Sequence, residues 1–119
     1  MKEKRLIWIG SSKKDLEDLP EDIVRAFGYG LYRAQVGEQH ENAKILKGFG
    51  GAGVLELIES DGDGTYRAVY TIQMKEIVFV LHVFQKKSKQ GIATPKKDID
   101  LVKHRLKQAQ IMYKELERE

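Results

Sequence analysis

Residues 77–84, with the sequence IVFVLHVF, constrain the fold of this chain more than any other segment. Successive side chains of a β-strand point to opposite faces of the sheet. This run is apolar on both alternating faces, so both faces need apolar cover. The segment therefore predicts a central strand with other elements packed on both sides of its sheet.

The same run ends in a cluster of positive charge. Phe84 is followed within five residues by Lys86, Lys87 and Lys89. A strand that only builds a core has no need of three lysines at its exit, so the cluster favours a site for an anion. The alternative interpretation is a solvated patch that aids solubility.

Hydrophobic periodicity and turn residues predict the remaining elements. The expected order is a strand at 5–9, helices at 13–19 and from Pro20, a loop at 37–53, strands at 54–59, 66–72 and 77–84, and a helix opened by Pro95. This order predicts an α+β fold in one domain, 1–119. Its small, mainly antiparallel sheet contains the N-terminal strand and a three-strand meander, with two N-terminal helices and one C-terminal helix.

Local signals give finer expectations for the first two helices. Ser12 and Asp15 are spaced like a capping box, with Asp in place of the usual Glu, so Ser12 is the expected N-cap of the helix at 13–19. Gly28 and Gly30 weaken the propensity of the second helix by roughly 1 kcal/mol each relative to alanine. Close packing against a neighbouring element is the simplest reason for them.

Composition narrows the class of protein. The chain has 119 residues and no cysteine, which excludes disulfides, thiolate metal sites and a cysteine nucleophile. It has no apolar run of about 18 residues, which argues against a membrane span. The apolar run near the N-terminus is too short for a signal peptide. A cytoplasmic protein is expected.

Charge is unevenly distributed on a chain of net charge +3. Residues 15–22 carry five acidic residues and no basic one. Residues 86–107 carry eight lysine and arginine residues against Asp98 and Asp100. Such a basic region indicates contact with a polyanion, although a solvated helix face is the alternative for the lysines of the last helix.

Several segments match a known sequence motif but lack the neighbouring elements or the ligands that the motif needs. GFGGAG (48–53) matches a dinucleotide-binding pattern, but an expected loop precedes it and a strand follows, where that fold needs a strand and then a helix. DGDG (61–64) lacks the further oxygen ligands of a calcium loop. The three histidines lie on different expected elements without metal-ligand spacing. No metal and no cofactor are expected.

Arg67 and His82 are the polar residues that need an explanation in the predicted sheet. An arginine on an otherwise apolar strand needs a partner. A salt bridge to Glu56 or Glu59 would supply one, and the alternative is that the guanidinium clamps a phosphate. His82 is either a hydrogen-bonded core histidine or part of a site.

The meander can bring Glu56, Arg67, His82 and the lysine pair 86–87 to one end or face of the sheet, and Lys47 of the preceding loop could close over it. Several cations beside one possible base, with no metal, suit metal-independent cleavage of RNA. In that reaction the ribose 2′-hydroxyl attacks the adjacent phosphate, cations stabilise the transition state, and a base and an acid transfer protons. DNA lacks the 2′-hydroxyl, so the chemistry would be specific for RNA.

Three segments carry a family resemblance: YR-x-VY in the second meander strand, LH-x-FQKKS-x-QGI-x-TPKKDI after it, and LKGFG–G–VLEL before it. With them the chain resembles the phage-derived Gp49-like group of the RelE/HigB toxin superfamily. The resemblance implies a toxin of a type II toxin–antitoxin pair that enters the ribosomal A site and cuts messenger RNA. It implies a small helix-turn-helix antitoxin of the HigA type as partner.

The resemblance also implies roles for individual residues. Arg67 matches the arginine that binds the scissile phosphate, and Lys87 the basic residue that stabilises charge or acts as acid. Lys86 is its basic neighbour, and Lys47 is placed near the site. Lys89, Lys96 and Lys97 would then contact RNA.

Two departures from the superfamily pattern leave the activity open. Ribosome-dependent nucleases of the superfamily carry lysines on the first meander strand, where this chain has Glu56. The tyrosine that follows the last strand in some relatives is missing. Either Glu56 or His82 takes over proton transfer, or the activity differs. A toxin of the same fold that inhibits DNA gyrase without being an enzyme, and an inactive phage remnant, are the alternatives.

Overall fold

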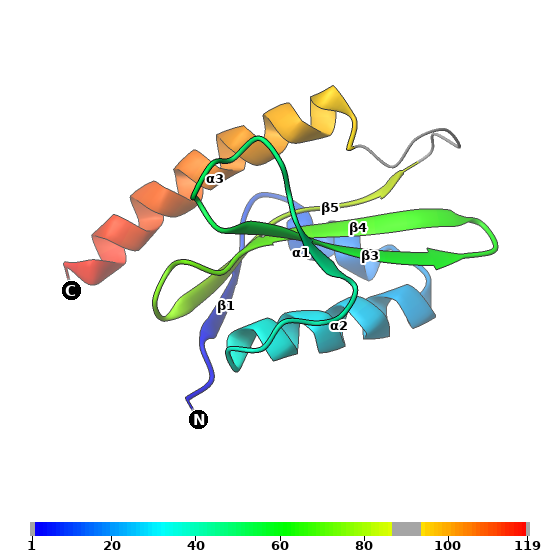
Figure 1. Ribbon diagram of the computed structural model, residues 1–119, viewed down its shortest axis with the longest axis horizontal. Coiled ribbons are helices and arrows are strands. Elements are labelled where there is room, and N and C mark those ends of the chain that lie inside the picture. Colours follow the sequence, from blue (N-terminus) through cyan, green and yellow to red (C-terminus); the bar gives the residue numbers. More distant parts are fainter. Residues whose placement is uncertain (1, 87–93, 119) are drawn as a thin grey trace.

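The computed structural model describes residues 2–86 and 94–118 (Figure 1). The elements are β1 (Arg5–Trp8), α1 (Ser12–Glu17), α2 (Glu21–Gln35), β2 (Ala43–Ile45), β3 (Val54–Asp61), β4 (Gly64–Thr71), β5 (Ile77–Lys86) and α3 (Lys96–Glu117). They confirm the predicted α+β fold. None of the described helices is long and apolar enough to span a membrane.

All five strands form one sheet in the order β1-β5-β4-β3-β2. β1 runs parallel to β5, and the other pairs are antiparallel. The prediction of a continuous loop over 37–53 is wrong, because β2 adds an edge strand beside β3. Three residues with one buried side chain, Ala43, are too short a pattern for periodicity to reveal.

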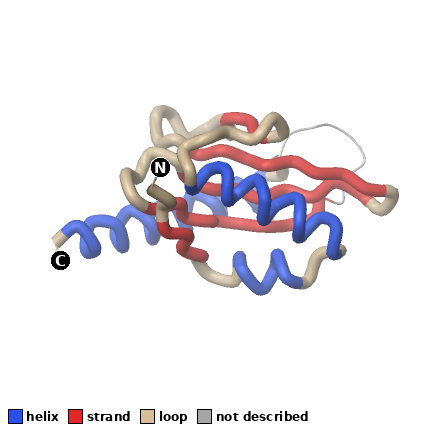
Figure 2. Tube along the Cα trace, turned by 90° about the horizontal axis from the view of Figure 1, so that it is seen from below, coloured by secondary structure: helices blue, strands red, loops and turns tan. Residues whose placement is uncertain are grey.

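The sheet lies between two helical layers. In Figure 1, α3 covers one face and α2 the other, and Figure 2, which is seen from below, shows α2 in front of the strands and running along them. Side chains of β5 enter both cores: Val78, Val80 and Val83 pack with α1 and α2 residues, whereas Phe79 and Leu81 pack with α3 residues. This confirms that the run 77–84 is an inner strand covered on both faces.

A β-bulge in β5 changes which face its later residues occupy. Tyr70 of β4 pairs with Val80 and the preceding Val69 pairs with His82, so Leu81 is the extra residue. Regular alternation from Leu81 would place His82 toward α2. The extra residue instead turns His82 toward α3, where its ring meets Asp98.

The turn after β1 fastens to the bulge. Ser12 is buried and its Oγ donates to the carbonyl of Val80 at 3.1 Å. The N-cap position belongs to Ser11, so the expected capping box at Ser12 is wrong. Arg105 of α3 donates to the carbonyl of Leu81 at 2.9 Å and to Ser11 Oγ at 3.2 Å. Gly10 has a φ of +58°, and a Cβ there would meet the Arg105 guanidinium at 2.8 Å.

The two glycines of α2 differ in their surroundings. A Cβ at Gly30 would meet Cδ1 of the fully buried Leu57 at 2.7 Å, which confirms close packing there. A Cβ at Gly28 would meet nothing within 4 Å, so close packing does not explain that residue.

The glycine pair gives a matched stability prediction. Gly28→Ala should raise the free energy of unfolding by about 0.5–1 kcal/mol, because alanine favours helix. Gly30→Ala has the same gain in helix propensity but overfills the core. Its free energy of unfolding should therefore be lower than that of Gly28→Ala by about 1–3 kcal/mol. Urea denaturation of both variants measures the difference, and equal stabilities would contradict the packing described for Gly30.

Candidate functional site

The α3 face of the sheet carries a row of polar side chains across three strands. Glu56 of β3 lies opposite Val69 of β4, which lies opposite His82 of β5. Arg67 is two residues before Val69 and opposite Phe84. Arg67 therefore sits on the middle strand, diagonal to both Glu56 and His82, at distances that long side chains can bridge.

Glu56 and Arg67 form a buried ion pair. Arg67 Nη1 donates to Glu56 Oε1 at 2.7 Å, and each residue is 4% exposed. This confirms the expected salt bridge and selects Glu56. Glu59, the other predicted partner, instead accepts from Asn42 at 2.9 Å.

Thr94, just before α3, completes the pair from outside the sheet. Its hydroxyl donates to Glu56 Oε2 at 2.7 Å. Arg67 Nη1 lies 3.5 Å from the same hydroxyl oxygen. Each oxygen of the Glu56 carboxylate therefore has its own donor, as a buried charge requires.

His82 makes the second buried polar contact with the start of α3. Its Nε2 lies 2.7 Å from Asp98 Oδ1, and its ring stacks on Phe84 with centroids 4.5 Å apart. Burial lowers the pKa of His82 from 6.5, while the bond to Asp98 acts in the opposite direction. When the ring is neutral and the carboxylate is ionised, Nε2 carries the proton and donates, because an ionised carboxylate only accepts. Nδ1 is buried without a hydrogen-bond partner among the described residues. The hydrogen-bonded core histidine considered from the sequence is thus observed.

The predicted lysines fall into three groups. Lys86 ends β5 and is buried, opposite Thr65. Lys87 and Lys89 lie outside the described residues. The exposed lysines are Lys47 on the β2–β3 loop, Lys96, whose Nζ is 3.0 Å from Asp100, and Lys97 in the first turn of α3. No described contact links Lys47 to the ion pair, so its closing over the site stays a prediction.

Three residues were missed from the sequence. Thr94 and Asp98, at the start of α3, contact Glu56 and His82 of the polar row. The sequence does not show these contacts, because they depend on how the helix packs on the sheet. The sequence shows Asp98 only as a counter-charge within the basic region 86–107. Lys44 is exposed and lies opposite Glu56 on β2, so it shares the α3 face. It was missed because β2 was expected to be a loop.

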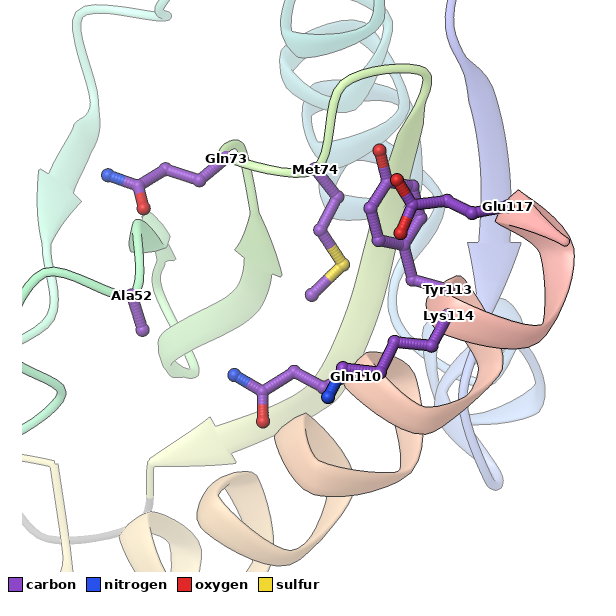
Figure 3. Close-up of a pocket in the computed structure, with 7 residues that line it drawn as sticks. All are labelled: Ala52, Gln73, Met74, Gln110, Tyr113, Lys114 and Glu117. Carbon is purple, nitrogen blue, oxygen red and sulfur yellow. The ribbon is translucent and has the colours of Figure 1, made fainter.

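A cavity of about 470 Å³ lies elsewhere, toward the C-terminal end of α3. Figure 3 shows Tyr113, Gln110 and Lys114 of α3 facing Met74 and Gln73 of the β4–β5 connection. None of the predicted site residues lines it. Within the described part of the chain, no group of three or more His, Asp or Glu side chains could hold a metal ion.

A family model, described as phage-derived protein Gp49-like, matches residues 14–107. The chain belongs to this Gp49-like family. Among curated proteins, none is significantly similar in sequence to this Gp49-like chain.

Two solved structures show the fold. A mutant of the E. coli toxin RelE in the free state is 19% identical, covers 73% of this chain and 87% of its own, and gives a TM-score of 0.55. The RelBE2 toxin–antitoxin complex of Mycobacterium tuberculosis is 24% identical. The match covers 74% of this chain and 97% of that chain, with a TM-score of 0.51. The Gp49-like chain therefore has the fold of RelE toxins, as its sequence resemblance implied.

Removing one partner of the ion pair should be costly. Arg67→Ala leaves a buried carboxylate without its cation and should lower the free energy of unfolding by about 3–5 kcal/mol. The double variant Glu56→Leu with Arg67→Met should recover most of that loss, because no charge then remains buried. Urea denaturation compares the two, and a loss below about 1 kcal/mol in Arg67→Ala would show that the pair is not buried as described.

His82 should make stability depend on pH. Its folded pKa lies below the unfolded value of 6.5. The unfolded chain therefore binds more protons in the interval between the two values. The contribution of His82 to the free energy of unfolding is fully present above pH 6.5 and is lost as the pH falls through the folded pKa. Thermal unfolding from pH 7.5 to 5 should show this loss in the wild type and less of it in His82→Gln, and parallel profiles would contradict the prediction.

Proposed function

We propose that this protein is the toxin of a type II toxin–antitoxin module and acts as a ribosome-dependent endoribonuclease on messenger RNA. The observation that carries the proposal is the Glu56–Arg67 pair beside His82 on one sheet face, in a fold shared with a RelE toxin. A carboxylate, a guanidinium and an imidazole together provide a possible base and a phosphate ligand. The chemistry is a metal-independent attack of the ribose 2′-hydroxyl on the adjacent phosphate.

Each predicted residue has a role in this reaction. Arg67 binds the scissile phosphate through its planar fork. Glu56 or His82 takes the 2′-hydroxyl proton. Lys86, which ends β5, and Lys87, the next residue of the sequence, stabilise developing negative charge or protonate the leaving oxygen.

Four further lysines form the wider RNA contact in the proposal: Lys47, Lys89, Lys96 and Lys97. Cations placed around a site hold the phosphate backbone without reading its sequence. Their contribution should weaken with added salt, since each phosphate contact releases counterions.

The proposed partners are a small helix-turn-helix antitoxin of the HigA type, the ribosome and its message, all in the cytoplasm. The RelBE2 structure, a toxin–antitoxin complex, supports the antitoxin. Co-expression with the product of the adjacent gene, followed by affinity purification, tests this partner. Recovery of the chain alone, still toxic to growth, would count against it.

One observation favours a second function. Glu56, Arg67, His82 and Lys86 are each at most 7% exposed, so substrate has to displace their present contacts. A toxin that inhibits DNA gyrase by binding alone does not need these contacts to be displaced. Pulse labelling in growing cells separates the two, because a nuclease stops protein synthesis first and a gyrase inhibitor stops DNA synthesis first.

The test of the nuclease is cleavage of a short message on programmed ribosomes, with free RNA as control. Arg67→Lys keeps the charge beside Glu56 but removes the fork, so cleavage should slow roughly a hundredfold, as for loss of one oxyanion donor. Arg25→Lys, an exposed arginine on α2, is the matched control and should cut at the wild-type rate. Equal rates for Arg67→Lys and wild type would rule out this role of Arg67. If the wild-type protein cuts nothing yet stalls supercoiling by gyrase, the second function takes its place.

A further inference from the structure

The Glu56 carboxylate is held by two different donors that belong to different parts of the fold. Oε1 accepts from Arg67, its neighbour on the sheet, at 2.7 Å. Oε2 accepts from the hydroxyl of Thr94, at the start of α3, also at 2.7 Å. Loss of either donor would leave the other in place.

The first turn of α3 fixes the position of Thr94. The chain turns directly from Thr94 into the helix, and the amide of Asp98 donates to the carbonyl of Pro95 at 3.0 Å. The Asp98 side chain is anchored to β5 by its 2.7 Å contact with His82. The hydroxyl that meets Glu56 is therefore carried by a helix start that is fastened to the neighbouring strand.

A phosphate that binds Arg67 has to compete with Glu56 for the guanidinium. An ionised carboxylate and a phosphate oxygen accept from the same donors. When Nη1 turns to the phosphate, Oε1 loses its donor while Oε2 keeps Thr94. Binding of the anion thus converts an ion-paired carboxylate into one with a free, oriented oxygen.

We propose that Thr94 is a positioning residue that holds Glu56 as the general base while Arg67 transfers to the scissile phosphate. The inference rests on the proposed function and assigns the proton acceptor to Glu56 Oε1. The 2′-oxygen forms a bond to phosphorus as its proton passes to Oε1. The bond from phosphorus to the 5′-oxygen breaks, and this oxygen takes a proton from a protonated side chain of the site. Among the residues that the structure describes, Lys86 is the candidate for this proton donor.

Thr94→Val is the sharpest variant, because it removes the hydroxyl and keeps the shape. Single-turnover cleavage of message on programmed ribosomes should slow roughly tenfold to a hundredfold, the range for a hydrogen bond to a charged group. The protein concentration for half-maximal rate should change little, since the short bond of Thr94 is to Glu56 at 2.7 Å, whereas its contact with the phosphate ligand Arg67 is long at 3.5 Å. Thr94→Ser keeps the donor and should recover most of the rate.

The matched control is Ser60→Ala on β3, which removes an exposed hydroxyl bonded only to Thr65 among the described contacts. It should cut at the wild-type rate. A wild-type rate in Thr94→Val would overturn the proposal. A rate in Thr94→Ser as low as in Thr94→Val would also overturn it, because a variant that keeps the hydroxyl would then have failed to keep the rate.

If the wild-type protein cuts no message, the proposed nuclease fails, and the positioning role is decided by phosphate binding alone. Isotope-labelled protein is titrated with inorganic phosphate, and NMR follows the Arg67 Nε–H signal and the Glu56 carboxyl carbon. Phosphate should move the Arg67 signal in both proteins, whereas the Glu56 signal should shift or broaden more in Thr94→Val than in the wild type. An Arg67 signal that phosphate leaves in place, or a Glu56 signal with the same response in both proteins, would overturn the role of Thr94.

Discussion

The buried ion pair between Glu56 and Arg67 is the interaction on which the α3 side of this domain depends. Two charges removed from water are tolerated only when their geometry and remaining hydrogen bonds are nearly complete. The sheet supplies the 2.7 Å contact between them, and Thr94 supplies the donor for the second carboxylate oxygen. The helix α3 is therefore placed by polar contacts at its start as well as by the apolar core beneath it.

The bulge at Leu81 lets a single strand serve both the core and the site. Before it, β5 alternates between two apolar layers. After it, His82 faces α3 and reaches Asp98. The carbonyl freed at the bulge accepts from Arg105. An inserted residue thus aims a polar side chain at a helix start without leaving a buried carbonyl unsatisfied, a use of bulges common next to functional sites.

Sequence predicted the architecture because long periodic segments decide it: the run 77–84 fixed the layers, and turn residues separated the meander strands. It also predicted a salt bridge from Arg67 to Glu56 or Glu59, since opposite charges on neighbouring strands attract each other, and the structure selects Glu56. The edge strand at 43–45 and the role of Thr94 could not be predicted from the sequence. A three-residue strand has too few positions to show a period. A contact between residues 38 positions apart depends on how α3 docks on the sheet, which no local pattern encodes.

The central claim is that Arg67 exchanges the Glu56 carboxylate for a phosphate of the message while Thr94 retains that carboxylate. A structure of the protein on a ribosome, with a message blocked by a 2′-O-methyl group at the cleavage position, tests this most directly. The account predicts a phosphate oxygen at about 3 Å from the Arg67 guanidinium, with Glu56 still bonded to Thr94. An unbroken Glu56–Arg67 pair, with no phosphate in reach of the guanidinium, would contradict it.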